Sequence, residues 1–205
     1  MTNRLLIFIL FVFFASLSQL DAQNAVKLSS RHALSNGIPT VKNANNNARF
    51  MFHGIALSYQ RDWFDKPWYE FGLGFNYMNE DKSTTTEVFI EANRKIFKEL
   101  LALPKLQTFF SLRPRVFYIH NEDLKGTPSK FETLGLEMPF VLNIEYHLNS
   151  KFRLYTCLNI FNSSFAYDRQ DIMTPGLTIQ QRVNEGFDID ITLLTEIRFG
   201  VGYVL

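Results

Sequence analysis

The last nineteen residues of the chain, 187–205, alternate apolar and polar side chains almost without interruption. Such a period of two over this length predicts one long β-strand with two chemically different faces. The polar face carries Asp188, Asp190, Glu196 and Arg198 and needs water or ion-pair partners. The opposite face needs hydrocarbon or a protein core, and consists of Phe187, Ile189, Ile191, Leu193, Thr195, Ile197, Phe199, Val201, Tyr203 and Leu205.

Six further segments show the same alternation, which predicts a protein built almost entirely of strands. They are residues 49–60, 68–79, 84–97, 106–120, 132–148 and 152–166. The fifth of these is the cleanest. Only Asn149, Ser150 and Lys151 separate it from the sixth, and a connection of that length is a hairpin signal.

Loop lengths favour an eighth strand. Bacterial membrane barrels have short periplasmic turns, longer external loops, an even strand number and both termini in the periplasm. If the turn at 149–151 is periplasmic, so are 60–67 and 97–105, while 121–131 and 168–186 are external. Parity then requires a strand at 25–34, with 35–48 as the first external loop. We therefore predict an all-β protein: an antiparallel up-and-down transmembrane β-barrel of eight strands.

The N-terminus predicts a secretory signal peptide over residues 1–22. Arg4 supplies the positive charge, and an apolar run over 5–15 is followed by small and polar residues up to Ala22. That run is too short for a membrane-spanning helix, which needs roughly 20 apolar residues. The barrel domain then comprises residues 23–205.

Composition narrows the possible functions. The formal net charge of +1 gives no support for nucleic-acid binding. Cys157 is the only cysteine, so the chain cannot form an internal disulfide. No two of the histidines, at positions 32, 53, 120 and 147, stand at metal-ligand spacing. We find no catalytic constellation and no motif for a metal or cofactor, and so expect a protein that is not an enzyme.

Charged residues on the polar faces would point into the barrel. An eight-stranded barrel is just wide enough to be filled by its own side chains, so no open pore is expected. Buried ions are costly unless paired. We expect Arg113 and Arg115 to face Glu87 and Glu91 on the preceding strand. The whole predicted lumen ion-pair network is Glu87, Glu91, Arg113, Arg115, Glu145, Arg153, Asp188, Asp190, Glu196 and Arg198, on polar faces that also carry Glu70, Lys95 and Glu137.

Four stretches carry a resemblance to a known class: Asp21-Ala22-Gln23 and residues 72–77, 143–152 and 199–205. With these the chain resembles small outer-membrane β-barrel proteins of Gram-negative bacteria, particularly the Bacteroidota type. The resemblance implies location in the outer membrane and a last strand that the barrel-assembly machinery reads. Ending on Leu205, with Tyr203 two residues earlier, departs mildly from the aromatic end common in the class.

Known members of the class include adhesins, structural barrels, secretion components and a few lipid-modifying enzymes. We therefore expect an integral outer-membrane barrel with a structural, surface-interaction or assembly role. Its expected partners are outer-membrane lipid, the assembly machinery and a protein at the external loops. One alternative is an enzyme acting on outer-membrane lipid, with Tyr118, His120 and Asp168 as the nearby polar set. Another is a secreted, lipocalin-like barrel whose apolar faces point inward.

Overall fold

The structure is a computed structural model that describes residues 24–34, 51–61, 69–80, 83–96, 100–123, 129–173 and 180–205. The predicted signal peptide and the predicted external loop at 35–48 lie outside the described residues. Within the described ranges, no helix is long and apolar enough to cross a membrane.

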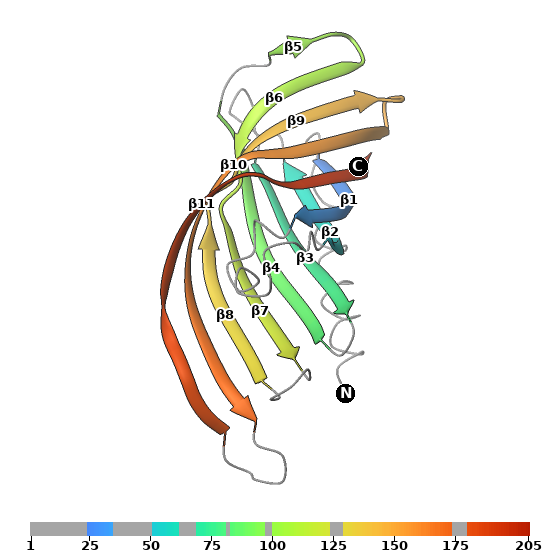
Figure 1. The fold of residues 1–205 in the computed structure, drawn as a ribbon. Helices are drawn as coiled ribbons and strands as arrows, with labels where there is room; N and C mark the ends of the chain where they lie inside the picture. The colour runs from blue at the N-terminus through green and yellow to red at the C-terminus, as the bar shows by residue number, and fades with distance from the viewer. Residues whose placement is uncertain are drawn as a thin grey trace.

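The described residues form one antiparallel sheet, in which β11 pairs with both β1 and β10 and so closes the sheet on itself (Figure 1). The strands are β1 (Asn24–Leu34), β2 (Met51–Arg61), β3 (Tyr69–Glu80), β4 (Ser83–Lys95), β5 (Leu101–Ala102), β6 (Leu106–Leu112), β7 (Arg115–Asp123), β8 (Ser129–Glu137), β9 (Phe140–His147), β10 (Phe152–Met173) and β11 (Gln180–Val204).

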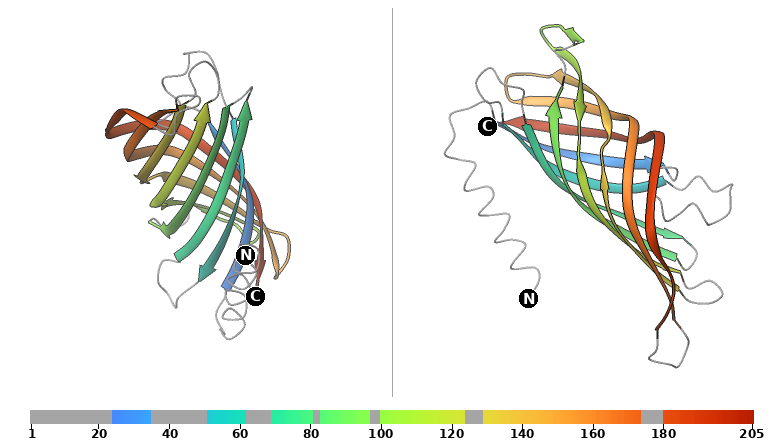
Figure 2. Two further views of the ribbon diagram at one scale, coloured as in Figure 1. Left: turned by 90° about the horizontal axis from the view of Figure 1, so that it is seen from below. Right: turned by 90° about the vertical axis from the view of Figure 1, so that its left-hand side faces the viewer.

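These strands make a closed, antiparallel, eight-stranded barrel, as the alternation and the parity of the loops predict. β6 and β7 are two parts of one barrel strand, because β4 pairs with both. β8 and β9 are likewise two parts of one strand beside β10. β11 closes the barrel against β1, where Ala25 pairs with Val204 (Figure 2). The predicted strand at 25–34 is therefore confirmed as β1.

Prolines interrupt two of the predicted strands. The segments predicted as continuous over 106–120 and 132–148 each break, at Arg113-Pro114 and at Met138-Pro139. Proline has no N–H to donate to a sheet, so it interrupts the ladder of hydrogen bonds. Both proline carbonyls still accept bonds: Ala92 donates to Pro114 and Arg113 to Pro139, each at 3.0 Å. The breaks are therefore local, and pairing resumes on both sides.

A β-bulge interrupts the alternation predicted for 152–166. The register of β10 shifts between Asn159 and Phe161. An extra residue at such a point reverses which side chains face inward. As a result Asn159 and Asn162 are both buried, although they are three residues apart.

The two ends of the barrel differ in shape. At the end that we call the terminal end, Leu205 donates to Asn24, Val204 to Lys151 and His147 to Lys105. Both ends of the described chain therefore lie beside the tight turns, as the predicted topology requires. At the opposite, distal end, β10 and β11 form a long hairpin that projects beyond the other strands (Figure 1).

The predicted external loops are shorter than expected. Residues 121–131 and 168–186 were assigned to loops on their polarity, but β7 runs to Asp123, β8 starts at Ser129, and β10 and β11 extend to Met173 and Gln180. In these two segments the strands continue to pair through their backbones, although neither face of the strand is apolar. A polar stretch therefore marks the end of the apolar outer surface and not the end of the strand.

Candidate functional site

The interior of the barrel is charged and closely balanced. Arg153, at its edge, has a side chain only 11% exposed. Each of the following is less than 10% exposed: Glu70, Glu87, Glu91, Glu137, Glu145 and Glu196 among the acids, and Lys27, Arg31, Arg113, Arg115 and Arg198 among the bases. With Arg153 included, six basic groups face six glutamates. Such a balance is what burial of charge requires.

Glu196 of β11 lies at the centre of this interior. Its carboxylate accepts hydrogen bonds from Arg31 of β1, Arg115 of β7 and Arg198 of its own strand. The Arg115 Nη2–Glu196 Oε2 distance is 3.0 Å. One carboxylate thus joins strands from opposite parts of the sequence across the lumen.

Three further glutamates complete the central cluster. Glu91 accepts from Arg198 at 2.7 Å and lies 3.4 Å from Arg115 Nε. Glu137 accepts from Arg115 at 3.0 Å. Glu87 accepts from Arg31 and from Asn76. We call these four glutamates, with Arg31, Arg115 and Arg198, the lumen network.

One aromatic ring packs against all three arginines of the lumen network. The guanidinium carbons of Arg31, Arg115 and Arg198 lie 4.8, 4.6 and 5.4 Å from the centre of the Phe89 ring. Cations over a ring face are attracted to it, more strongly where water is excluded. Phe89 therefore both fills the lumen and holds the arginines in place.

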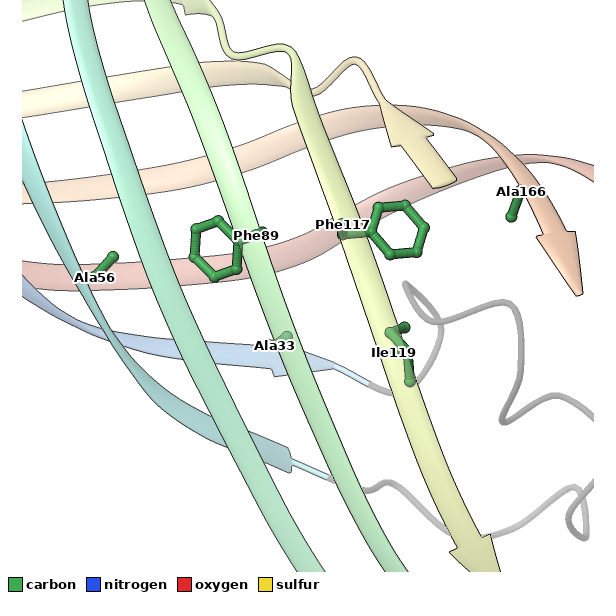
Figure 3. Packing of buried hydrophobic residues seen from close by; sticks show 6 residues of the cluster. All are labelled: Ala33, Ala56, Phe89, Phe117, Ile119 and Ala166. Atoms are coloured by element: carbon green, nitrogen blue, oxygen red, sulfur yellow. The ribbon is translucent and has the colours of Figure 1, made fainter. Parts of the chain in front are cut away.

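Facing glycines make room for the large rings inside the barrel. Phe89 is the register partner of Gly74, Phe117 of Gly135 and Tyr155 of Gly200. A Cβ atom at these glycines would lie 2.1, 2.3 and 2.4 Å from the respective rings. Figure 3 shows the Phe89 and Phe117 rings beside Ala33, Ala56, Ile119 and Ala166, which form an apolar layer within the interior.

A second ion cluster lies nearer the terminal end. Lys27 Nζ is 2.6 Å from Glu145 and 3.2 Å from Glu70, and Arg153 lies 3.7 Å from Glu145. Ser58 also donates to Glu70. The charges of this cluster balance without help from the lumen network.

Arg113 occupies a different environment from the one predicted for it. Its Nη2 atom donates to Asn143 Oδ1 and to Cys157 Sγ, both at 3.3 Å. Asn143 in turn donates to Ser111 at 2.7 Å. Arg115 thus lies beside Glu91, whereas Glu87 pairs with Arg31 and Arg113 binds neutral groups.

The charged residues of the lumen differ from the ion-pair network predicted from the sequence: some predicted residues are not described there, and some lumen residues were not predicted. Asp188 lies on β11 opposite Ala166 and is not among the partners described for the lumen network, and the side chain of Asp190 is not among those described. The predicted network omitted Lys27 and Arg31, because the segment 25–34 alternates poorly in apolar character. Its alternate positions Lys27, Ser29 and Arg31 are nevertheless all buried and polar. A search for inward polar residues would have found them.

Cys157 provides a direct probe of lumen packing. It is 3% exposed and is the only cysteine of the chain. We expect a water-soluble maleimide to leave the folded barrel unlabelled and to label the urea-unfolded chain fully within minutes. Mass spectrometry of the intact protein measures both. Equal labelling rates for the two states would contradict a filled lumen.

The outer wall is apolar on each of the eight barrel strands. Ile90 is 64% exposed and Ile55 61%. A shallow apolar groove of about 490 Å³ crosses this wall from Leu28 to Leu134. We define the apolar belt as Leu28, Ile55, Leu73, Phe75, Val88, Ile90, Leu112, Val116, Leu134, Leu136, Ile144, Leu154, Phe161, Phe199 and Val201, all more than a third exposed. A lipocalin-like arrangement, with apolar faces inward, is therefore wrong for this chain.

A polar cluster lies on the same wall beyond the distal edge of the belt. Glu132 accepts from Tyr118 at 3.0 Å, pairs with Lys130 at 2.9 Å and lies 3.9 Å from both His120 and Arg169. The hydrogen bonds from Lys130 and Tyr118 hold the pKa of Glu132 below its usual range.

The polar set proposed for a lipid enzyme is divided between the two faces of the sheet. Tyr118 and His120 contact Glu132 on the outer wall. Asp168 instead accepts a hydrogen bond from Thr133, which is fully buried on the inner side. The described contacts thus do not assemble Tyr118, His120 and Asp168 into one site, and within the described residues no group of three or more metal-ligating side chains occurs.

No protein-family model matches the chain, and no curated protein matches it. The solved structures that are similar in fold include two outer-membrane proteins. Neisserial surface protein A is 10% identical with a TM-score of 0.50, covering 89% of this chain and 96% of its own. A major outer membrane protein from Thermus thermophilus is 11% identical with a TM-score of 0.50, covering 89% of this chain and 99% of its own. The chain therefore has the fold of small, eight-stranded outer-membrane β-barrels.

Proposed function

We propose that the protein is an integral outer-membrane barrel with a closed lumen and a structural, surface-interaction or assembly role. The observation that carries this proposal is the inversion of ordinary protein packing: the belt is apolar and exposed, while the lumen is charged and buried. Only a hydrocarbon solvent makes that inversion favourable, since apolar surface of this extent is costly in water. A closed barrel also leaves no unpaired strand edge within lipid.

The apolar outer wall and the distal end of the barrel suggest the proposed partners. Lipid chains contact the belt, and the projecting β10–β11 hairpin with the polar cluster around Glu132 offers a surface for a protein partner outside the membrane. β11 is the strand that the barrel-assembly machinery reads during biogenesis. The leader and the terminal motif support a Bacteroidota-type member of the class, delivered to the outer membrane by its signal peptide.

The pairing of the titratable groups supports a non-catalytic role. The lumen charges form ion pairs with one another, which gives them a structural role. On the outer wall, the polar side chains around Glu132 likewise pair with one another.

Vesicle reconstitution tests the proposal. The mature chain, folded into phospholipid vesicles, is expected to resist carbonate extraction and to add no ion conductance above that of protein-free bilayers. Release by carbonate without detergent would overturn the membrane assignment. A stable, protein-dependent conductance would overturn the closed lumen while leaving the membrane assignment intact.

Substituting Ile90 with arginine tests the orientation of the wall. Ile90 is the most exposed belt residue on β4, and an arginine on the lipid face near the bilayer centre costs about 2–4 kcal/mol. We expect the Ile90→Arg barrel to lose that much unfolding free energy in vesicles, measured by urea titration. Ser150→Arg, in an exposed turn, is the control and should change it by less than about 0.5 kcal/mol. Equal effects would contradict a lipid-facing belt.

A further inference from the structure

Two histidines meet on the outer wall, although 21 positions separate them in the sequence. His32 of β1 and His53 of β2 are register partners in the antiparallel pair. Both belong to the outward row of their strands, because the neighbours Arg31 and Ala33 are buried in the lumen. The sequence spacing of these histidines gave no reason to expect a shared site.

The two imidazoles approach each other through the same ring atom. The Nδ1–Nδ1 distance is 2.9 Å, and the ring planes are inclined at 77° with centroids 5.1 Å apart. Histidine nitrogens bind metals such as zinc at about 2.0–2.1 Å. In the square-planar or tetragonal geometry of Cu²⁺ and Ni²⁺, two adjacent nitrogen ligands bind at right angles and at this bond length are about 2.9 Å apart. The two nitrogens share a hydrogen bond in the structure, and their separation equals that of two adjacent ligands of one ion.

Apolar and aromatic residues flank the pair on the outer wall. Ile197 and Tyr77 are the register partners on the outer sides of His32 and His53. The Phe199 ring lies 6.3 Å from that of His32.

We propose that His32 and His53 form a two-histidine chelate for a late first-row divalent ion of tetragonal geometry, namely Cu²⁺ or Ni²⁺. Imidazole suits these ions, and Cu²⁺ binds most tightly among them at a given nitrogen site. Because the described residues supply no third ligand, water completes the coordination. The pair lies two residues, about 7 Å along the strands, from Leu34 and Met51 in the distal half of the hairpin, and the His53 side chain is exposed.

Binding of Cu²⁺ to the folded barrel tests this site. The mature chain, purified without a histidine tag and folded in detergent, is titrated by calorimetry, and its electron paramagnetic resonance spectrum is recorded. We expect one site per barrel and a spectrum showing two nitrogen ligands. His32→Ala and His53→Ala should each weaken binding at least about tenfold. His120→Ala and His147→Ala, which alter histidines elsewhere, should leave the affinity unchanged.

A second measurement separates loss of a ligand from loss of folding. Excess Cu²⁺ should raise the urea midpoint of the unmodified barrel, because an ion that binds only the folded state stabilises it. The His32→Ala and His53→Ala barrels, shown to be folded by heat-modifiable migration in gels, should show no such rise. The proposal is overturned if both variants bind Cu²⁺ as tightly as the unmodified barrel, if only one nitrogen ligand is detected, or if His120→Ala weakens binding equally.

Discussion

Replacing Gly74 with valine is expected to prevent the barrel from folding. A Cβ atom at this position would lie 2.1 Å from Cζ of Phe89, far inside van der Waals contact. The ring has little freedom to move away, because three guanidiniums pack around it and it is only 4% exposed. Folding yield in lipid vesicles, measured as the heat-modifiable fraction on gels, should fall from most of the protein to a small residue.

Gly186 supplies the matched control. A Cβ atom there meets nothing within 4 Å, so Gly186→Val should fold as well as the unmodified chain. The double variant Gly74→Val with Phe89→Ala removes the colliding ring and should recover part of the yield. Normal folding of Gly74→Val alone would show that Phe89 does not occupy the lumen as described.

Replacing Glu196 with glutamine is expected to be the most destabilising change of a single charge. The variant keeps the shape of the side chain but removes the negative charge that Arg31, Arg115 and Arg198 share. Removing one partner of a buried ion cluster typically costs about 3–5 kcal/mol, because the remaining charges stay buried without compensation. Urea unfolding of the barrel in vesicles measures this loss directly.

Glu122→Gln is the control for this prediction. The Glu122 side chain is 49% exposed and pairs only with His120 among the described contacts, at 3.1 Å. Exposed pairs of this kind contribute about 0–1 kcal/mol. A loss of stability as small for Glu196→Gln as for Glu122→Gln would show that water reaches the centre of the lumen and screens its charges.

Much of the architecture follows from local patterns. The alternation at 187–205 required a long two-faced strand, and β11 is that strand. Strand parity required β1 even though its own alternation is poor, because a barrel without open edges needs an even number of antiparallel strands. The predicted strand centres agree with the structure, whereas the distal ends are wrong, since polar strands continue to pair beyond the level of the belt.

Most contacts between side chains inside the barrel could not be predicted from the sequence. Register alone places Arg115 beside Glu91, so that pair could be expected from neighbouring strands. Arg31 meets Glu87 across the lumen from a strand that is not adjacent, and no local pattern links them. The bulge near Asn159 depends on how β9 and β11 pair with β10, so the sequence alone could not predict it either.

The sequence by itself determined the strand-forming segments, the face of each strand that is apolar and the closed, even-numbered barrel, because a period of two is a property of neighbouring residues. Only the tertiary structure decided which charges pair, which glycines admit the Phe89, Phe117 and Tyr155 rings, and that His32 meets His53. These contacts join residues far apart in the chain. Their geometry depends on the register and curvature with which the sheet closes, and that is set by the packing of all strands together.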